Sequence, residues 1–278
     1  MLERIKDYLF KTWLIMSALI VVLVVVFLFG YIFINGIGSI DKEFLLSEPK
    51  GIPIGIEGGI FPAIIGSLLL MLIACVFSSI LAISTAIYVV FYCKSERIKS
   101  FIHLIIQCMS GVPSIVLGLF GYALLVLYLG FGRSLLSGGI TLGIFIFPFI
   151  QIRVEKTLKE VDKSIITSSY ALGVSEVYTL FKIILPICRA DIISAITLAG
   201  GFAMGAASPI ILTAAVMFAP VPESLFSPVM ALPFHLYILT GEGISLEKAY
   251  GTALVLMLLL LVINIISIIL NIKRKESR

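Results

Sequence analysis

The chain has little charge for its length. Only 13% of its 278 residues are Asp, Glu, Lys or Arg, whereas soluble domains average about 25%. Seven windows hold no charged residue at all: residues 12–38, 58–93, 100–132, 134–152, 192–222, 224–241 and 249–272. A helix needs about 20 apolar residues to cross a bilayer. The scarcity of charge therefore excludes a soluble domain and predicts an all-α, polytopic membrane protein.

Motifs for catalysis and nucleotide binding are also missing. Neither G-x-x-x-x-G-K-[ST] nor G-x-G-x-x-G occurs, the only two histidines fall on opposite membrane faces, and the four cysteines lack metal-ligand spacing. The predicted span interiors contain no Asp, Glu, Lys or Arg, which argues against an ion-driven pump. We expect a non-enzymatic chain that binds no cofactor or metal and takes its energy from another subunit.

Six of the charge-free windows predict membrane spans, and together they form one transmembrane domain over residues 1–278. Window 224–241 is short and contains Pro228, Pro233 and His235, so we interpret it as an external or re-entrant hairpin. With both ends cytoplasmic, 16 of the 20 Lys and Arg residues fall on the cytoplasmic side, as the positive-inside rule requires. The basic surplus thus reflects topology and does not indicate nucleic acid. The spans lie at about 13–35, 61–92, 101–129, 137–152, 190–218 and 249–272.

Residues 153–189 are the one long polar stretch in the second half of the chain, and they predict two short amphipathic helices. The first apolar face ends at Gly173, a residue suited to a left-handed helix end. The second is expected to stop at Pro186. Such helices either lie on the lipid surface or insert into a groove of a partner. The two faces comprise Val154, Leu158, Val161, Ile165, Ser168 and Leu172, then Val174, Val177, Tyr178, Phe181 and Ile184.

A resemblance favours the partner. Residues 169–173 (SYALG), followed by residues 183–186 (IILP), resemble the EAA loop of permeases from binding-protein-dependent ABC importers, although the leading Glu-Ala-Ala is degenerate here. The resemblance implies a type I ABC importer permease fold in a prokaryotic plasma (inner) membrane. It also implies that the loop docks on an ATPase dimer, which carries the ATP and magnesium. The implied docking residues are Ser169, Tyr170, Ala171, Gly173, Glu176, Tyr178, Phe181 and Pro186.

Three further motifs resemble phosphate permeases of the PstA type: residues 58–67 (GGIFPAIIGS), 111–120 (GVPSIVLGLF) and 232–237 (LPFHLY). The family implies import of inorganic phosphate by a heterodimer with a companion permease. It also implies an external substrate-binding protein that docks on loops 36–60 and 219–248.

One segment departs from that family. Where its fifth span carries Arg, Glu and Thr, this chain has Phe202, Ala206 and Ala207, so phosphate specificity does not carry over on those residues. A permease of the same fold for another anion or small solute stays open, as does a channel or structural subunit without ATP coupling. The small residues of this span predict close helix packing, within the subunit or across an interface. Candidate residues of the translocation path are Ser67, Pro113, Ser114, Phe202, Ser208, Pro209 and Thr213.

Overall fold

The computed structural model describes residues 2–52 and 55–275, with side chains described from 6 to 269 apart from residues 53 and 54. These residues are mostly helical, which confirms the predicted all-α class. One short antiparallel pair joins β1 (Pro49–Lys50) to β2 (Glu57–Gly58), with Pro49 opposite Gly58. The helices are α1 (Leu2–Gly36), α2 (Lys42–Leu46), α3 (Phe61–Ile87), α4 (Glu96–Gly111), α5 (Ser114–Gly121), α6 (Leu135–Lys159), α7 (Lys163–Ala171), α8 (Glu176–Thr179), α9 (Leu185–Met204), α10 (Leu232–Gly241) and α11 (Leu246–Lys275).

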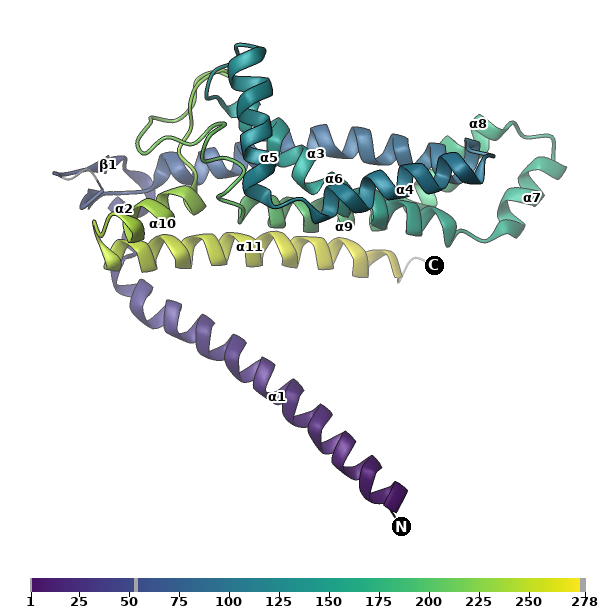
Figure 1. Ribbon diagram of the computed structural model, residues 1–278, viewed down its shortest axis with the longest axis horizontal. Helices are drawn as coiled ribbons and strands as arrows, with labels where there is room; N and C mark the ends of the chain where they lie inside the picture. The colour runs from purple at the N-terminus through teal and green to yellow at the C-terminus, as the bar shows by residue number, and fades with distance from the viewer. Residues whose placement is uncertain (1, 53–54, 276–278) are drawn as a thin grey trace.

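Several helices are long and apolar enough to cross a membrane. Within the described residues there are five, or up to six if the bent pair α4–α5 counts as one span. Helix α10 has only 10 residues and is too short to span, as predicted for the window around it. The long helices α3, α6, α9 and α11 run along one axis, with α7 and α8 at one end and α2, β1 and α10 at the other (Figure 1). The start of α1 and the end of α11 lie toward the end that carries α7 and α8.

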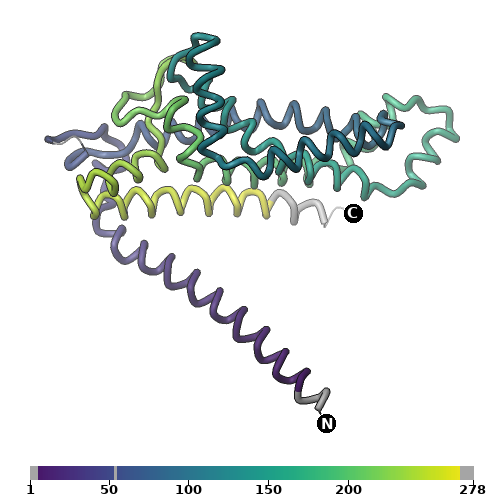
Figure 2. The backbone as a smooth tube through the Cα atoms, in the orientation of Figure 1, coloured from purple at the N-terminus to yellow at the C-terminus, as the bar shows by residue number. Residues whose placement is uncertain are grey.

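Helix α1 stands apart from this body along most of its length (Figure 2). It contacts α11 near its own C-terminal end, where the Tyr31 and Tyr250 rings meet edge to face at 5.8 Å. The apolar surface of the first span is therefore left uncovered by this chain.

Helices α6 and α9 both pack closely on α3 because glycines lie at the two contacts. A Cβ atom on Gly143 would lie 2.7 Å from the Phe77 ring on α3, and one on Gly200 of α9 would lie 2.7 Å from Cys75 Sγ. Lipid tails are as apolar as the side chains, so helices associate through such close packing rather than through the hydrophobic effect. Ala199 and Ala203 of α9 are also buried. These buried small residues of span 5 therefore pack within the chain.

The helix of predicted span 4 extends beyond the predicted span end at residue 152, since α6 continues to Lys159. Val154 and Leu158 are buried in the main hydrophobic core. Since these apolar side chains continue the buried face of α6, the helix extends past the first charged residue of the loop. The predicted first loop helix is accordingly divided, and only α7, which begins at Lys163, stands apart from the span.

The helix over the predicted span 190–218 also differs from that span at both ends. Its helix extends from Glu176 to Met204, and Pro186 does not end the preceding helix. A π-helical turn over Leu180–Ile184 shifts the hydrogen-bonding register, so that Pro186 stands in the first turn of α9. There its missing N–H is not needed.

Residues 205–231, beyond α9, are irregular, and neighbouring segments satisfy part of their backbone. Thr213 accepts a hydrogen bond from Ser134 N at 3.0 Å, and Ser227 accepts one from Leu135 N at 2.9 Å. Non-helical backbone at membrane depth is tolerated when protein supplies such partners.

The expected kink at Pro113 is confirmed and is sharp, since α4 and α5 meet at 100°. Val112 takes an extended conformation, as the residue before a proline prefers. Gly118 then brings α5 against Ser208 and Pro209, since a Cβ atom there would lie 2.9 Å from the Ser208 carbonyl oxygen.

Gly66 on α3 provides a test of this packing. A Cβ atom there would overlap the Met230 carbonyl oxygen, a backbone atom that cannot turn aside. We expect Gly66→Ala to lower the free energy of unfolding by about 1–3 kcal/mol, measured as a lower Tm in detergent. Gly30→Ala is the control, because nothing lies within 4 Å of a Cβ at Gly30. Equal Tm values for the two variants would contradict the packing.

His235 on α10 predicts a pH dependence of stability. Its side chain is 3% exposed, and burial, followed by the charge of Lys248, lowers its pKa from 6.5 to about 4. Below pH 6.5 His235 therefore binds a proton in the unfolded chain but stays neutral in the folded chain. The free energy of unfolding should consequently fall as the pH is lowered from about 6.5 to 4. We expect His235→Gln to flatten the Tm-versus-pH curve in this window. An unchanged slope would show that other groups cause the loss.

Candidate functional site

Helices α7 and α8 form a preorganised corner at one end of the molecule. Asp162 caps α7 by accepting a hydrogen bond from Ser164 N at 2.8 Å, and this bond lowers the pKa of the Asp162 carboxyl. Ser175 caps α8 by accepting one from Tyr178 N at 3.3 Å. Between the helices Gly173 adopts φ +76°, the left-handed conformation expected of it, and donates to Tyr170 O at 2.9 Å.

Around Gly173 the corner presents large apolar side chains to the outside. Leu172 is 83% exposed, and a Cβ atom on Gly173 would meet nothing within 4 Å. Scattered apolar residues on a surface are ordinary, but a cluster of this kind marks an interaction site. We call this cluster the docking corner; its exposed apolar members are Tyr170, Leu172, Val177, Tyr178 and Phe181.

Most of the predicted docking residues lie on this surface. Ala171, Glu176 and Pro186 are exposed, as are Tyr170, Gly173, Tyr178 and Phe181. Ser169 differs, because it is buried and its hydroxyl donates to Ile165 O at 2.8 Å. Ser169 therefore stabilises α7 from its buried side and is not part of the exposed surface.

The predicted path residues are divided between two kinds of environment. Ser67 and Thr213 are buried and hold the backbone: Ser67 Oγ accepts from Leu232 N at 2.8 Å, and Thr213 Oγ1 donates to Pro209 O at 2.8 Å. Pro113 and Ser114 lie at the α4–α5 bend, and α5 brings Gly118 against Ser208 and Pro209. The bend and the broken end of α9 are thus adjacent.

Phe202 belongs to an aromatic cluster. Its ring stacks on Phe145 at 5.2 Å between centroids and lies 4.8 Å from that of Phe149, both on α6. Phe202 and Phe149 are each about half exposed. This face of α6 and α9 is therefore apolar and offers no hydrogen-bond donor from these three rings.

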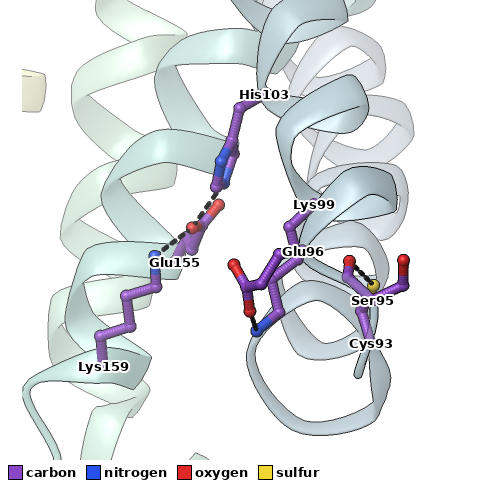
Figure 3. A network of polar contacts seen from close by, with 7 residues as sticks. All are labelled: Cys93, Ser95, Glu96, Lys99, His103, Glu155 and Lys159. Atoms are coloured by element: carbon purple, nitrogen blue, oxygen red, sulfur yellow. Dashed lines mark hydrogen bonds and ion pairs between the residues drawn. The ribbon is translucent and has the colours of Figure 1, made fainter.

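A buried polar network between α4 and α6 was not among the predicted site residues (Figure 3). Glu155 is 6% exposed and accepts three hydrogen bonds, from His103 Nε2 at 2.8 Å, Gln151 Nε2 at 2.7 Å and Lys159 Nζ at 2.6 Å. The prediction placed Glu155 in a loop because span 4 was ended at residue 152. The spacing of Gln151, Glu155 and Lys159 by four was a signal that they share a helix face.

Two cavities flank this network. One of about 450 Å³ lies between α4 and α6, lined by His103, Gln151 and Glu155 among others. The other, of about 410 Å³, lies on the side of α7 and is lined in part by Lys163 and Ile166. His103 and Lys159 line both. Within the described residues no three His, Cys, Asp or Glu side chains are grouped to hold a metal ion.

A body of apolar helices with a docking corner at one end is the architecture of an integral membrane transport subunit. Residues 78–273 match the family described as the inner membrane component of binding-protein-dependent transport systems, and the chain belongs to that family. It is a membrane-embedded permease subunit of an ABC importer, with ATP hydrolysis in a separate partner subunit.

Individual relatives agree with this assignment. The chain is 27% identical over 278 residues to the probable ABC transporter permease protein YqgI of Bacillus subtilis, covering 95% of this chain and 94% of that protein. It is 30% identical over 214 residues to the probable phosphate transport system permease protein PstA of Methanocaldococcus jannaschii, covering 74% of each. Among solved structures, a chain of the MetNI methionine ABC transporter in an inward-facing conformation matches with a TM-score of 0.61 and 16% identity, over 74% of this chain and 92% of that one. This last match confirms the type I importer permease fold.

Proposed function

We propose that the docking corner is the surface through which a cytoplasmic ATPase dimer, with its ATP and magnesium, drives this permease. The observation that carries the proposal is the exposed apolar cluster around Gly173, fixed by the caps at Asp162 and Ser175. An apolar helix face inserted in a groove is a recurrent mode of recognition. Closure of the ATPase would move the corner and switch the spans between outward-facing and inward-facing states.

The same geometry supports an orientation. The docking corner, the start of α1 and the end of α11 lie toward one end of the molecule, and in the predicted six-span topology 16 of the 20 Lys and Arg residues fall on that side. By the positive-inside rule this end is cytoplasmic. An external substrate-binding protein would then dock at the opposite end, on α2, the β1–β2 pair and α10.

For the solute we propose inorganic phosphate, imported by a heterodimer with a companion permease. The relatives named PstA support phosphate. Burial of an anion needs donors or positive charge, and the cluster of Phe145, Phe149 and Phe202 supplies neither. The companion permease would therefore contribute the charged groups of the pathway.

A permease for a less charged solute is the second candidate. It is favoured by the aromatic cluster around Phe202 and by the relative YqgI, whose name specifies no solute. Binding of radiolabelled phosphate by the external binding protein that co-purifies with the complex distinguishes the two candidates, since the second predicts no phosphate binding.

Gly173→Arg tests the docking corner. We expect a loss of ATP-dependent uptake in proteoliposomes of at least tenfold, because arginine is strained at this positive φ and its side chain projects into the docking surface. Membrane insertion should persist. Gly130→Arg is the matched control, since Gly130 also has a positive φ, +70°, with nothing within 4 Å of its Cβ, but lies in the turn before α6, outside both proposed docking surfaces. Normal uptake by Gly173→Arg, or equal losses in both variants, would refute the docking role.

Phe202→Arg tests the origin of the charge. In the heterodimer we expect this variant to import phosphate, because it places on α9 the charge that a phosphate pathway requires. Removal of the companion's intramembrane arginine should abolish phosphate uptake. A purified homodimer of this chain that imports phosphate would overturn the proposed division of roles.

A further inference from the structure

Among the side chains that the structure describes, one hydrogen bond joins helix α4 to another helix. It runs from His103 Nε2 to Glu155 Oε1 of α6, at 2.8 Å. The other bonds of α4 side chains, from Lys99 to Glu96 and from Ser110 to Ile106, stay within the helix. His103 and Glu155 therefore supply the directional contact between α4 and α6, beside apolar packing such as that of the buried Ile106.

The Glu155 carboxylate is held in one orientation. Oε2 accepts from Gln151, one turn before it on α6, and Oε1 accepts from Lys159, one turn after it. A buried carboxylate that loses a partner is costly, so Glu155 favours every position of α4 that keeps His103 within reach. The bond is thus a tether for α4.

The tether crosses a loosely packed gap. Cavities of about 450 and 410 Å³ lie on its two sides, and His103 and Lys159 line both. Close-packed interfaces resist sliding, and α4 is not close-packed against α6 and α7 at these two pockets. The second cavity is also lined by Lys163 and Ile166 of α7. The tether therefore lies next to the helix that leads to the docking corner.

Beyond the tether, α4 leads to the translocation path. Helix α4 ends at Gly111, and α5 departs at 100° from the Val112–Pro113 break. Helix α5 lies against Ser208 and Pro209 through Gly118, and against Thr141 through Gly121. A shift of α4 therefore changes the position of α5 beside the broken end of α9.

We propose that His103 and Glu155 are positioning residues that transmit movement of the docking corner to the bent span α4–α5. Three residues, 160–162, separate α6 from α7, so a displacement of α7 reaches the end of α6 that carries Glu155. His103 draws α4 along, and α5 moves against Ser208 and Pro209. This role rests on the proposed docking of an ATPase at the corner.

The test uses the complete complex and a readout that needs no substrate. Spin labels are attached to the native Cys108 on α4, which is exposed, and to Ile80→Cys on α3, which is 62% exposed, with the other three cysteines replaced by alanine. We expect ATP and vanadate to shift the distance between the labels in this background. The shift should be lost in His103→Phe, which keeps a ring but lacks the donor, and retained in His103→Gln, whose amide can donate to Glu155.

Transport is the second readout. Phosphate imported per ATP hydrolysed should fall roughly fivefold or more in His103→Phe, as expected for loss of an allosteric coupling, with His103→Gln close to wild type. Glu160→Gln is the matched control, because Glu160 directly follows α6 and its ion pair with Lys156 is exposed to solvent, the two side chains being 65% and 66% exposed. If His103→Phe does not assemble, His103→Ala replaces it, since the adjoining cavity admits water to Glu155.

The outcomes separate this inference from the proposed function. A label shift without phosphate import supports the tether and refutes phosphate as the solute. An unshifted distance in the labelled wild type, or a shift that persists in both His103→Phe and His103→Ala, overturns the tether. An equal loss of coupling in Glu160→Gln also overturns it, because the effect would then be one of surface charge.

Discussion

The close approach of α3 to α6 and α9 is the constraint on which the rest of the structure depends. Glycines at positions 143 and 200 bring the backbones near enough for side chains to interlock, and in lipid this packing must supply the association that water supplies elsewhere. The resulting core fixes α6 from Leu135 to Lys159. Backbone N–H groups at its start donate hydrogen bonds to the irregular segment 205–231. Its last turn is followed, after residues 160–162, by α7. A rigid α6 therefore connects the two ends of the permease.

The two interruptions of helical structure near α6 lie where other parts of the protein cover them. The bend at Val112–Pro113 and the irregular segment after Met204 meet through Gly118. Residues 214–229 are further held by backbone bonds of 3.2 Å between Val216 and Val229 and between Val229 and Ala214. Irregular backbone of this kind can change conformation at less cost than a packed helix. The positions suited to a moving part thus lie beside the proposed path, while the central helices provide the frame.

The sequence predicted the features that depend on local chemistry. Charge-free runs identified the membrane helices, Pro113 identified the bend, and Gly173 was correctly expected to adopt a left-handed conformation. The errors arose where tertiary contacts overrode a local signal. Arg153 marks a loop by its charge, yet α6 continues past it because Val154 and Leu158 reach the core. Pro186 marks a helix end, yet a π-helical turn accommodates it. The Glu155 network was missed because span 4 was ended before it and because one of its three donors, His103, lies 52 residues away in sequence.

The account's central claim is that the corner between α7 and α8 contacts the ATPase. A photo-cross-linking residue placed at Leu172, which is 83% exposed, tests this directly. The same residue at Leu46 is the control, because Leu46 is 68% exposed but lies at the opposite end of the molecule. Irradiation of the assembled complex should join position 172 to the ATPase and leave position 46 without an ATPase adduct. An ATPase adduct from position 46, or none from position 172, would contradict the account.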